Sequence, residues 1–465
     1  MLKDVEEVAV QRRSLEAYRR YVTEEQMRLL HDQAQEARQS VQRAHLWVLN
    51  STASGGGVSE ILRSILSYCF DLGVQPRWLV ISGTEEFYAI TKRIHNGLHA
   101  SPGDGKDLSR KEQSIYKDVL FANWQQLRSL IQPNDIVLLH DPQTAGLIPW
   151  IREHGASVIW RSHIGYEDQR NSLVRRSWEF LRSDLQVAHA HVFTRKPYVP
   201  WFLKSENVFL VHPSIDAFSA KNQEMSFEQC WAIVQQIGLV GNDHSVSASP
   251  SFQRFNGQVA DVQSTVNATC EEASVDFQKP VITQVSRWDR LKDMLGVMKA
   301  LALGVLEDQD AQLLLVGPEV DGVDDDPEGA ETFQECKQFW EKLPLEGRKR
   351  VTLLQLPMHD LEENAAMVNA IQRLSHVIVQ KSLYEGFGLT VTEAMWKKKP
   401  VVASGVGGIP DQVVDQETGL LLSDPNDLSA FQRLVCQLLT NRGEAANMGE
   451  RGHKRVAEQF LHVRH

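Results

Sequence analysis

The segment from residue 380 to residue 411, QKSLYEGFGLTVTEAMWKKKPVVASGVGGIPD, combines carboxylates and glycines in a pattern that suits anion binding. Two carboxylates, Glu385 and Glu393, are separated by seven residues. Between them a glycine loop leads into the predicted start of a helix, through Gly386, Phe387, Gly388, Leu389 and Thr390. Glycines expose backbone N–H groups and a helix N-terminus carries partial positive charge, so both attract an anion. The segment therefore predicts an anion site with one carboxylate in the loop and one on the helix.

Two cations follow an apolar run in the segment VSRWDRLKD, residues 285–293. Arg287 and Lys292 lie five residues apart, just past the predicted strand. Two cations at a strand end can clamp a diphosphate. The same pair also fits surface charges on a first helical turn, where Lys292 would be exposed and contribute little stability. The residues alone leave both interpretations open.

Polar residues also follow strands in the first half of the chain. His140 and Asp141 begin the sequence HDPQ, and His163 lies in the sequence RSHIG. A carboxylate and imidazoles supply the acceptors and donors that sugar hydroxyls need. A single histidine at a strand end is more often structural, but two in neighbouring strand–helix units favour a site. The three glycines of NSTASGGGVSE, residues 50–60, fit either a ligand-binding loop or a tight turn.

The elements that must position these residues form two series of buried strands alternating with amphipathic helices. This alternation predicts two doubly wound parallel sheets built from βαβ units. Ligands bind beyond the carboxyl ends of such strands, so a site is expected in a cleft between two facing domains. The predicted strands are 45–50, 77–82, 135–140, 157–162, 191–195 and 208–212 in the first series, and 281–286, 311–317, 351–356, 376–380 and 400–404 in the second.

The domain boundary is expected near residue 215, with domains 1–215 and 216–465. The first 40 residues are expected to form a helical arm, with a capping box at Thr23 and Gln26. Residues 241–279 are rich in small polar residues and lack a sustained period. We therefore expect a mobile insertion or surface loop there, outside the fold.

Composition excludes several classes of protein. The 465 residues carry 49 Lys and Arg against 60 Asp and Glu, a formal net charge of −11, which disfavours nucleic-acid binding. Five cysteines lie far apart without a CxxC pair, so we expect a reducing cytoplasm and neither a zinc ribbon nor a disulfide scaffold. The charged N-terminal sequence does not resemble a secretory signal, and no run of 18 apolar residues predicts a membrane span.

The 380–411 segment, with SRWDRLK before it, resembles the retaining GT-B glycosyltransferases of the sucrose and trehalose synthase type. Within that group, NSTASGGGVSE, HDPQTAGLI, RSHIG, PSIDAFSAKN and QKSLYEGFGLTVTEAMW are similar to the trehalose glycosyltransferring synthases. The resemblance covers most of residues 45–460. It implies a GT-B architecture of two Rossmann-like domains and an enzyme that joins the glucose of a nucleoside diphosphate (NDP) glucose to free glucose, giving trehalose and NDP, in a reaction expected to be reversible.

The resemblance also implies a role for each matching residue. The donor diphosphate would be held by Arg287 and Lys292, with the amides of Leu389 and Thr390 facing the phosphate. The ribose would be held by Glu393, and the donor glucose by Glu385 with the backbone of Gly386, Phe387 and Gly388. The first domain would line the site with Gly56 and Gly57, place His163 near the donor sugar, and contact the acceptor through Asp141, His140 and Gln143.

No obligatory cofactor is expected, although Mg²⁺ can accompany the nucleotide. Asp324 and Asp326 lie in a turn-like run, DDDPEG, and we do not expect them to bind a metal. The expected partners are therefore NDP-glucose and glucose or trehalose, without nucleic acid or membrane, and a homodimer stays open. Two alternatives also stay open: a retaining trehalose phosphorylase that uses inorganic phosphate, and a non-catalytic relative that acts as an interaction subunit.

Overall fold

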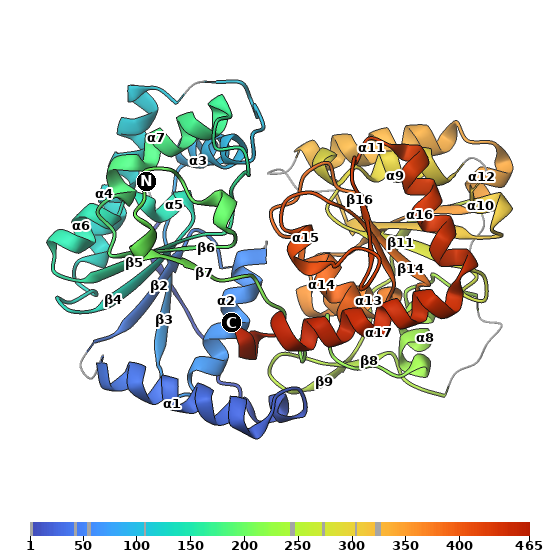
Figure 1. Cartoon of the computed structure of the whole chain (residues 1–465), viewed down its shortest axis with the longest axis horizontal. Coiled ribbons are helices and arrows are strands. Elements are labelled where there is room, and N and C mark those ends of the chain that lie inside the picture. The colour runs from blue at the N-terminus through green and yellow to red at the C-terminus, as the bar shows by residue number, and fades with distance from the viewer. Residues whose placement is uncertain are drawn as a thin grey trace. The chain divides into compact units, whose positions relative to one another are not determined.

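The computed structural model describes residues 3–40, 44–53, 57–106, 108–241, 247–271, 275–302, 305–320 and 327–465. The chain divides into two compact units, which Figure 1 shows with their elements labelled. One unit is Met1–Ser214 with His462–His465, and the other is Ile215–Leu461. The last four residues were expected in the second domain, whereas the structure groups them with the first unit.

The first unit is built on a seven-stranded sheet of order β1-β3-β2-β4-β5-β6-β7. Every neighbouring pair is parallel except β1 with β3, so β1 is an antiparallel edge strand. The chain order reverses between β2 and β4, and their carboxyl ends open the crevice where such sheets bind ligands. The strands are β1 (Glu6–Val8), β2 (Leu46–Asn50), β3 (Pro76–Val80), β4 (Ile136–His140), β5 (Ser157–Ser162), β6 (Ala190–Phe193) and β7 (Val208–Leu210).

Helices cover both faces of this sheet. Along β2, Trp47 and Leu49 join one buried cluster, whereas Val48 joins another with Leu62 and Leu66 of the helix that follows. This alternation is expected because successive side chains of a strand point to opposite faces. The helices are α1 (Glu24–Ser40), α2 (Gly57–Cys69), α3 (Glu85–Leu98), α4 (Arg110–Leu127), α5 (Pro142–Ala145), α6 (Ile148–Glu153) and α7 (Ser172–Leu185), with short 3₁₀ turns η1 (Glu16–Arg20), η2 (Lys196–Tyr198), η3 (Ser205–Asn207) and η5 (His462–Arg464).

The second unit repeats this plan with the order β10-β13-β12-β11-β14-β15-β16. Its edge strand β10 is antiparallel to β13, and all other pairs are parallel. The six parallel strands follow the 3-2-1-4-5-6 order of dinucleotide-binding sheets, with the switch point between β11 and β14. The strands are β10 (Asn267–Thr269), β11 (Val281–Val285), β12 (Gln312–Pro318), β13 (Val351–Leu356), β14 (Val377–Gln380), β15 (Val401–Ser404) and β16 (Leu420–Leu422), beside a separate hairpin of β8 (Ser251–Gln253) and β9 (Val259–Asp261).

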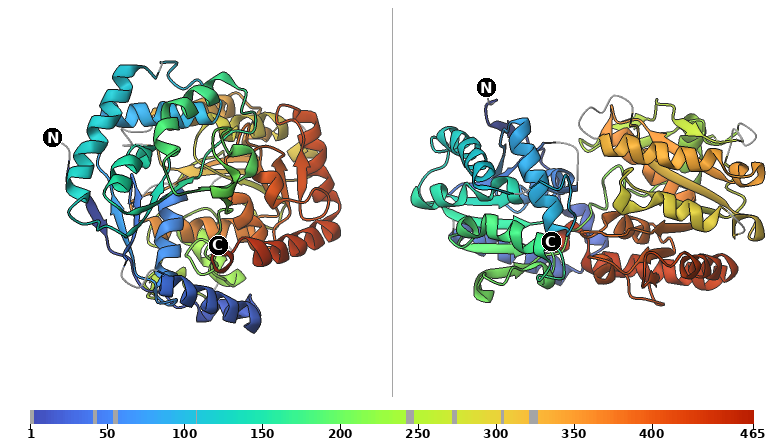
Figure 2. Two further views of the ribbon diagram at one scale, coloured as in Figure 1. Left: turned by 60° about the vertical axis from the view of Figure 1, so that its left-hand side comes forward. Right: turned by 90° about the horizontal axis from the view of Figure 1, so that it is seen from above.

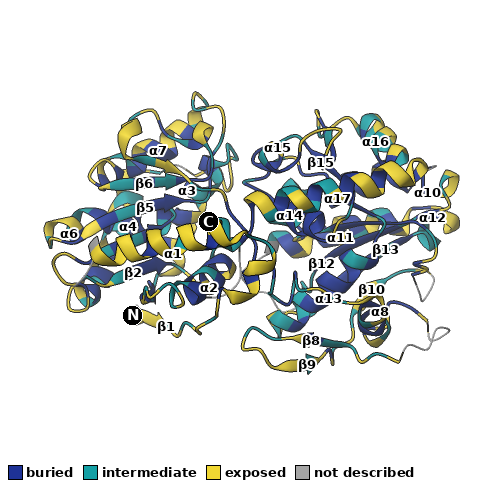
Figure 3. Ribbon diagram, turned by 60° about the horizontal axis from the view of Figure 1, so that its bottom comes forward, coloured by how far each residue is buried: buried dark blue, intermediate teal, exposed yellow. Residues whose placement is uncertain are grey.

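Two apolar clusters lie on the two faces of the second sheet. One holds residues of α9, α11, α16 and α17, and the other holds residues of α8 and α13. The two further views of Figure 2 show helices on either side of these strands, and Figure 3 shows the strands as largely buried. The helices are α8 (Phe227–Gln236), α9 (Met294–Leu301), α10 (Val305–Asp308), α11 (Pro327–Glu341), α12 (Leu345–Lys349), α13 (Leu361–Leu374), α14 (Leu389–Trp396), α15 (Ile409–Gln412), α16 (Leu428–Thr440) and α17 (Arg442–Gln459), with the 3₁₀ turn η4 (Arg290–Lys292).

All eleven strands predicted from the sequence are present, within one or two residues at most ends. The capping box before α1 is confirmed, because Thr23 N donates to Gln26 Oε1 at 3.0 Å and Gln26 N donates to Thr23 Oγ1 at 3.2 Å. The helical arm is wrong for residues 6–8, which form β1. The sequence of β1, EEV, is too short and polar to be read as a strand, and pairing with β3 decides its conformation.

The expectation that residues 241–279 lie outside the fold is also wrong. Phe252, Val262, Val275 and Phe277 are all less than 8% exposed and join the cluster packed against α8 and α13. Residues 267–269 form the edge strand β10 of the second sheet. The three-residue strands β8, β9 and β10 have at most one buried side chain each, so they show no detectable period and could not be recognised from the sequence.

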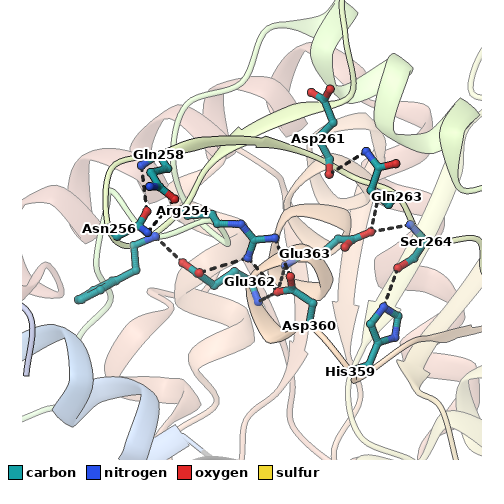
Figure 4. Close-up of polar contacts among 11 residues, drawn as sticks. Arg254, Asn256, Gln258, Asp261, Gln263, Ser264, His359, Asp360, Glu362 and Glu363 are labelled. Atoms are coloured by element: carbon teal, nitrogen blue, oxygen red, sulfur yellow. Dashed lines mark hydrogen bonds and ion pairs between the residues drawn. The ribbon is translucent and has the colours of Figure 1, made fainter. Parts of the chain in front are cut away.

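Polar contacts fix the β8–β9 hairpin to the start of α13, as Figure 4 shows. Arg254 pairs with Asp360 at 2.6 Å and with Glu362 at 3.4 Å. The buried carboxylate of Glu363 accepts the backbone N–H groups of Gln263 at 2.7 Å and Ser264 at 2.6 Å. A helix N-terminus favours carboxylates, and here these carboxylates also satisfy the backbone of the hairpin. Residues 247–271 and 275–279, the parts of this segment that the structure describes together with Gly241, are therefore anchored in the second unit.

Candidate active site

The second unit brings a cation and a carboxylate together at its switch point. Lys292, at the end of η4 after β11, places Nζ 2.6 Å from Oε2 of Glu385, in the loop after β14. Their side chains are 17% and 10% exposed, so the pair is largely shielded from solvent. Ser382 Oγ donates to the same oxygen of Glu385 at 3.3 Å. The carboxyl ends of β11 and β14 thus meet where the sheet topology predicts a ligand.

The η4 turn holds Lys292 in place through its backbone. Gln284 Nε2 donates to the carbonyl of Lys292 at 2.7 Å, and Gln284 Oε1 accepts from Lys381 N at 3.0 Å, which links the two strand ends. Asp293 adopts a left-handed conformation, with φ 49°, and caps α9. Lys292 is therefore not the exposed first-turn lysine that one interpretation allowed.

Arg287 lies in the same segment but in a different environment. Its side chain is 65% exposed and pairs with Asp289 at 2.8 Å. The described contacts do not join Arg287 to Lys292 or to Glu385. An exposed guanidinium on a flexible side chain keeps its freedom to turn toward an arriving anion, so Arg287 stays a predicted diphosphate ligand.

The glycine loop ends at the N-terminus of α14 as predicted. Gly388 is the N-cap with φ 87°, a conformation that favours glycine, and Leu389 and Thr390 begin the helix. Phe387 is 6% exposed, and its carbonyl accepts a hydrogen bond from Gln412 Nε2. The amides of the first helical turn have no partners within the helix and can serve a bound anion.

The loop that contains Gly408 packs against the glycine loop that precedes α14. A Cβ atom added to Gly408 would lie 2.7 Å from Phe387 Cα and 2.8 Å from the carbonyl oxygen of Gly386. The GVGG sequence therefore allows close approach of two backbones, and the position of the glycine loop depends on it.

Glu393, on α14, is buried at 4% exposure and lies 3.7 Å from Lys221 Nζ. Lys397 is also buried, and its Nζ donates to Asn222 Oδ1 at 3.1 Å and to the Glu393 carbonyl at 3.2 Å. Burial lowers the pKa of Lys397 well below its ordinary value. The three consecutive lysines at 397–399 are thus not uniformly solvated. Lys398 is exposed and pairs with Glu450, whereas Lys397 is buried and helps to hold α14 in place.

In the first unit, Asp141 leaves β4 in a strained conformation. Its φ of 63° and ψ of 175° lie in a region that is essentially reserved for glycine, at a cost of about 1–3 kcal/mol. Oδ1 accepts the backbone N–H of His163 at 2.8 Å, while Trp160 Nε1 donates to the Asp141 carbonyl at 3.1 Å. Burial raises the pKa of Asp141 to about 7, against the opposing effects of the His163 hydrogen bond and the Arg161 charge. Strain and a perturbed carboxyl together are typical of a functional site.

The two strand-end histidines are in direct contact. His140 Nδ1 lies 3.0 Å from His163 Nε2, and the two rings are stacked at 5.3 Å. Burial lowers the pKa of His140 to about 3 and that of His163 well below its ordinary value, and the charge of Arg161 adds to both shifts. Both imidazoles are therefore neutral at physiological pH, and one must donate a hydrogen bond to the other.

The remaining predicted residues of the first unit are only partly placed. Gln143 lies in α5, two residues beyond Asp141, and its buried Oε1 has no partner in the described part of the chain. Gly57 begins α2 and is exposed, whereas Gly56 lies outside the described residues. Asp324 and Asp326 lie outside them too.

Four contributors were missed by reasoning from the sequence. Arg161 and His465 surround the histidine pair, Ser382 contacts Glu385, and Lys221 contacts Glu393. Only Arg161 and Ser382 carried a signal, since each is two or three residues from a predicted site residue. Lys221 and His465 come from segments distant in sequence, and only the fold brings them in.

Other kinds of site find no support in the described ranges. No group of three or more His, Cys, Asp or Glu residues there could hold a metal ion. Among the same residues, no helix combines the length and apolar character of a membrane span. What the two sets of residues can do is bind an anion beside a carboxylate in the second unit, and orient hydroxyl groups in the first.

Comparison with known proteins identifies the family to which the chain is similar. Residues 48–200 match the family model described as trehalose synthase, N-terminal domain, and residues 271–455 match the model described as glycosyl transferases group 1. A trehalose synthase of Thermococcus litoralis is 34% identical over 420 residues, which cover 90% of this chain and 87% of that one. A trehalose phosphorylase of Pleurotus pulmonarius is 25% identical over 88% of this chain and 54% of its own length.

Among solved structures, the trehalose-6-phosphate synthase OtsA superposes with a TM-score of 0.66 at 12% identity, covering 91% of this chain and 97% of that one. This likeness confirms the predicted GT-B fold of two Rossmann-like α/β units. The extent and identity of the match to the Thermococcus protein decide the family. The chain belongs to the trehalose synthase family of GT-B glycosyltransferases.

Proposed function

We propose that this protein transfers the glucosyl unit of an NDP-glucose to free glucose, with retention of configuration, and forms trehalose and NDP. The observation that carries the proposal is the Lys292–Glu385 pair, which lies at the switch point of the second sheet beside the glycine loop before α14. A cation, a sugar-binding carboxylate and free helical amides at one point match the needs of a diphosphate-activated sugar. The sequence similarity to trehalose synthases supports the choice of sugar.

The second unit would bind the donor. Breaking the bond at the anomeric carbon builds negative charge on the leaving diphosphate and positive charge on the sugar. Lys292, Arg287 and the amides of Leu389 and Thr390 stabilise the leaving charge, an effect worth about 2.7–4 kcal/mol per donor in comparable sites. Glu385 and the glycine-loop backbone hold the glucose, and the buried carboxylate of Glu393 accepts the ribose hydroxyls.

The first unit would supply the residues for the acceptor. Oδ1 of Asp141 is already bonded to the His163 amide, and Oδ2 has no partner among the described residues, so this oxygen is available to an acceptor hydroxyl. His140 and Gln143 each carry a buried polar atom without a partner in the described part of the chain, His140 Nε2 and Gln143 Oε1. His163 contacts the donor sugar. Gly57, at the start of α2, would line the same side, and Gly56 stays a prediction from the sequence.

Retention follows in this scheme from attack on the face that the diphosphate leaves, with the leaving phosphate accepting the proton of the acceptor hydroxyl. No covalent enzyme intermediate is needed. We treat Mg²⁺ as a companion of the nucleotide substrate, because phosphate oxygens are ligands that it prefers. The scheme runs in both directions, since trehalose and NDP present the same groups to the same residues.

Trehalose phosphorylase activity is the second candidate, because a phosphorylase is among the relatives and would share the phosphate-facing residues. The buried carboxylate of Glu393 would serve the ribose hydroxyls of a nucleotide, which favours a nucleotide over inorganic phosphate. A non-catalytic role is disfavoured because Arg287, Lys292, Glu385 and Glu393 are all present.

The experiment that separates these functions is product analysis with trehalose plus UDP, ADP, GDP or inorganic phosphate in separate reactions. The proposal expects an NDP-glucose with at least one nucleotide, and proton NMR should show the same anomeric configuration in donor and product. Glucose 1-phosphate formed only with phosphate would establish the phosphorylase. No product in any reaction, together with no nucleotide binding by calorimetry, would support the non-catalytic role.

A further inference from the structure

Arg161 is a buried cation without a carboxylate partner among its described contacts. It lies on β5, opposite His140 in the strand register, and is 7% exposed. Nη1 contacts His465 Nε2 at 2.7 Å, Nη2 lies at a marginal 3.5 Å from the Val211 carbonyl, and Nε has no hydrogen-bond partner in the described chain. Buried guanidinium groups are normally paired with carboxylates, so this environment needs an explanation.

His465 is held in one tautomer by its neighbours. Its Nδ1 lies 3.0 Å from the His212 carbonyl, which can only accept a hydrogen bond, so Nδ1 carries the proton. Nε2 is then an unprotonated acceptor that faces Arg161, which can only donate. The geometry therefore requires a neutral imidazole, and both burial and the Arg161 charge lower the pKa of His465 well below its ordinary value.

Asp141 is the carboxylate whose charge acts on the Arg161 guanidinium, and the structure records no hydrogen bond between the two side chains. The charge of Arg161 acts on Asp141 and on both imidazoles of the histidine pair. With His465 as its acceptor, Arg161 exerts this charge without occupying the free Oδ2 of Asp141. Without that acceptor, the buried guanidinium would gain most by turning to Asp141, because a buried cation seeks the nearest anion.

We propose that His465 is a positioning residue: it accepts the hydrogen bond of Arg161 and so keeps the guanidinium from pairing with Asp141. The role of Asp141 toward the acceptor rests on the proposed function. The contact is local to the first unit, although the chain reaches His465 only after α17 of the second unit. The end of the described chain thus acts on a predicted catalytic carboxylate 324 positions earlier, through Arg161.

The charged and titratable groups around Asp141 come from three places. Arg161 approaches from β5, His140 and His163 from the ends of β4 and β5, and His465 from the C-terminal segment, with His462 next to it. Burial and the charge of Arg161 keep the imidazoles of His140, His163 and His465 neutral, so the guanidinium is the permanent charge among these four side chains. Changes in the position of this one charge should therefore dominate the ionisation of Asp141.

The test compares pH profiles of kcat/KM and kcat for His465→Ala and Arg161→Met. Wild-type kcat/KM should fall on the acid side as Asp141 takes up a proton. In His465→Ala the guanidinium pairs with Asp141, so this acid limb moves to lower pH by about one unit or more. The plateau kcat falls roughly 10- to 100-fold, because the oxygen needed by the acceptor is engaged. In Arg161→Met the acid limb moves the opposite way, to higher pH.

Two further variants serve as controls. His462→Ala removes an imidazole from the same segment, whose recorded contact is with Ser214 Oγ at 2.8 Å, and it should keep the wild-type profile. His465→Gln keeps an acceptor for Arg161 in its amide oxygen and should restore the profile, also if His465→Ala folds poorly. Thermal melts accompany each variant.

The proposal would be overturned if the pH profile changed equally in His465→Ala and His462→Ala. It would also be overturned if the acid limb moved in the same direction in His465→Ala and Arg161→Met. A readout independent of turnover is the NMR titration of the His163 imidazole, identified by its loss in His163→Gln. This signal should not titrate between pH 5 and 8 in the wild type, and in Arg161→Met its titration should move to higher pH, because burial still lowers the pKa but the guanidinium charge no longer adds to that effect. If the wild type makes no product while this titration behaves as expected, the proposed function fails and the electrostatic role of Arg161 stands.

Discussion

Lys292 Nζ lies 2.6 Å from Glu385 Oε2, which joins the residue expected at the donor diphosphate to the residue expected at the donor glucose. The two residues are 93 positions apart in the chain. Each neutralises the other in the free protein, so neither charge is buried alone. A diphosphate that binds Lys292 would release the carboxylate toward the sugar hydroxyls, which couples recognition of the two parts of the donor.

The first prediction concerns this pair. Lys292→Ala should lower turnover by roughly 10²–10³, because it removes one stabilising group for the leaving diphosphate. It should also destabilise the fold by about 3–5 kcal/mol, because it leaves the carboxylate of Glu385 buried and unpaired. Lys292→Met combined with Glu385→Gln should recover most of the stability and none of the turnover. Assays of NDP release and urea melts of the wild type and of these two variants test this.

The matched control for that prediction is Lys454→Ala. Lys454 is 77% exposed on α17 and lies 4.0 Å from Glu458, so stability should stay within about 0.5 kcal/mol and turnover should not change. Lys398 is less suitable, because its Nζ pairs with Glu450 Oε2 at 3.0 Å. Wild-type turnover in Lys292→Ala, or equal losses in Lys292→Ala and Lys454→Ala, would contradict the proposed stabilisation of the leaving group.

The second prediction uses the raised pKa of Asp141, about 7. A carboxyl whose pKa rises on folding destabilises the fold as pH rises above its unfolded value, and the full cost is reached above the folded value. Asp141→Asn removes this cost, so its melting temperature should exceed that of the wild type at pH 8 and match it near pH 4. Its turnover should be low at every pH, whereas wild-type kcat/KM should fall below about pH 7.

Asp118→Asn, at an exposed position on α4, is the control for this effect and should show no pH-dependent gain in melting temperature. If Asp141→Asn melts at the same temperature as the wild type at both pH values, the carboxyl is not held in the buried environment that the structure shows.

The third prediction tests the contact between the two glycine-containing loops. Gly408→Ala should raise the KM for NDP-glucose about tenfold or more, because its Cβ would meet the backbone of Gly386 and Phe387 at 2.8 and 2.7 Å. Gly405→Ala, whose nearest neighbour would be the Leu422 carbonyl at 3.4 Å, is the matched control and should bind the donor normally. Calorimetry with nucleoside diphosphate gives the same comparison without turnover, and equal affinities would show that the glycine loop does not depend on this contact.

The parts of the site that the sequence predicted are those in which the chemistry is local. The glycine loop and the N-terminus of α14 occupy consecutive residues, so spacing alone indicated their geometry. The partners could not be predicted in this way: Glu385 lies 93 residues after Lys292, and His465 lies 304 residues after Arg161. Pairs at such separations depend on which strands become neighbours, and side-chain patterns within one segment do not carry that information.

The strands of the fold were likewise predictable only where the signal is local in the sequence. Long apolar runs such as 135–140 and 351–356 form strands as expected, because their burial is decided within a few residues. The edge strands β1 and β10 escaped prediction, since EEV and NAT are polar and become strands only by pairing with β3 and β13. The strain at Asp141 was also invisible, because a residue type does not reveal its backbone angles.

The last prediction tests the corrected interpretation of residues 241–279. Phe252 is 2% exposed within the cluster beside α8 and α13, so Phe252→Ala should destabilise the second unit by about 3–5 kcal/mol. Val259 lies in the same hairpin at 74% exposure, and Val259→Ala should change stability by less than about 0.5 kcal/mol. Urea denaturation followed by tryptophan fluorescence measures both variants, with nucleotide binding as a check on the folded state. If the two variants are equally stable, the Phe252 side chain does not contribute to the core. The hairpin would then be a surface insertion, as the sequence predicted.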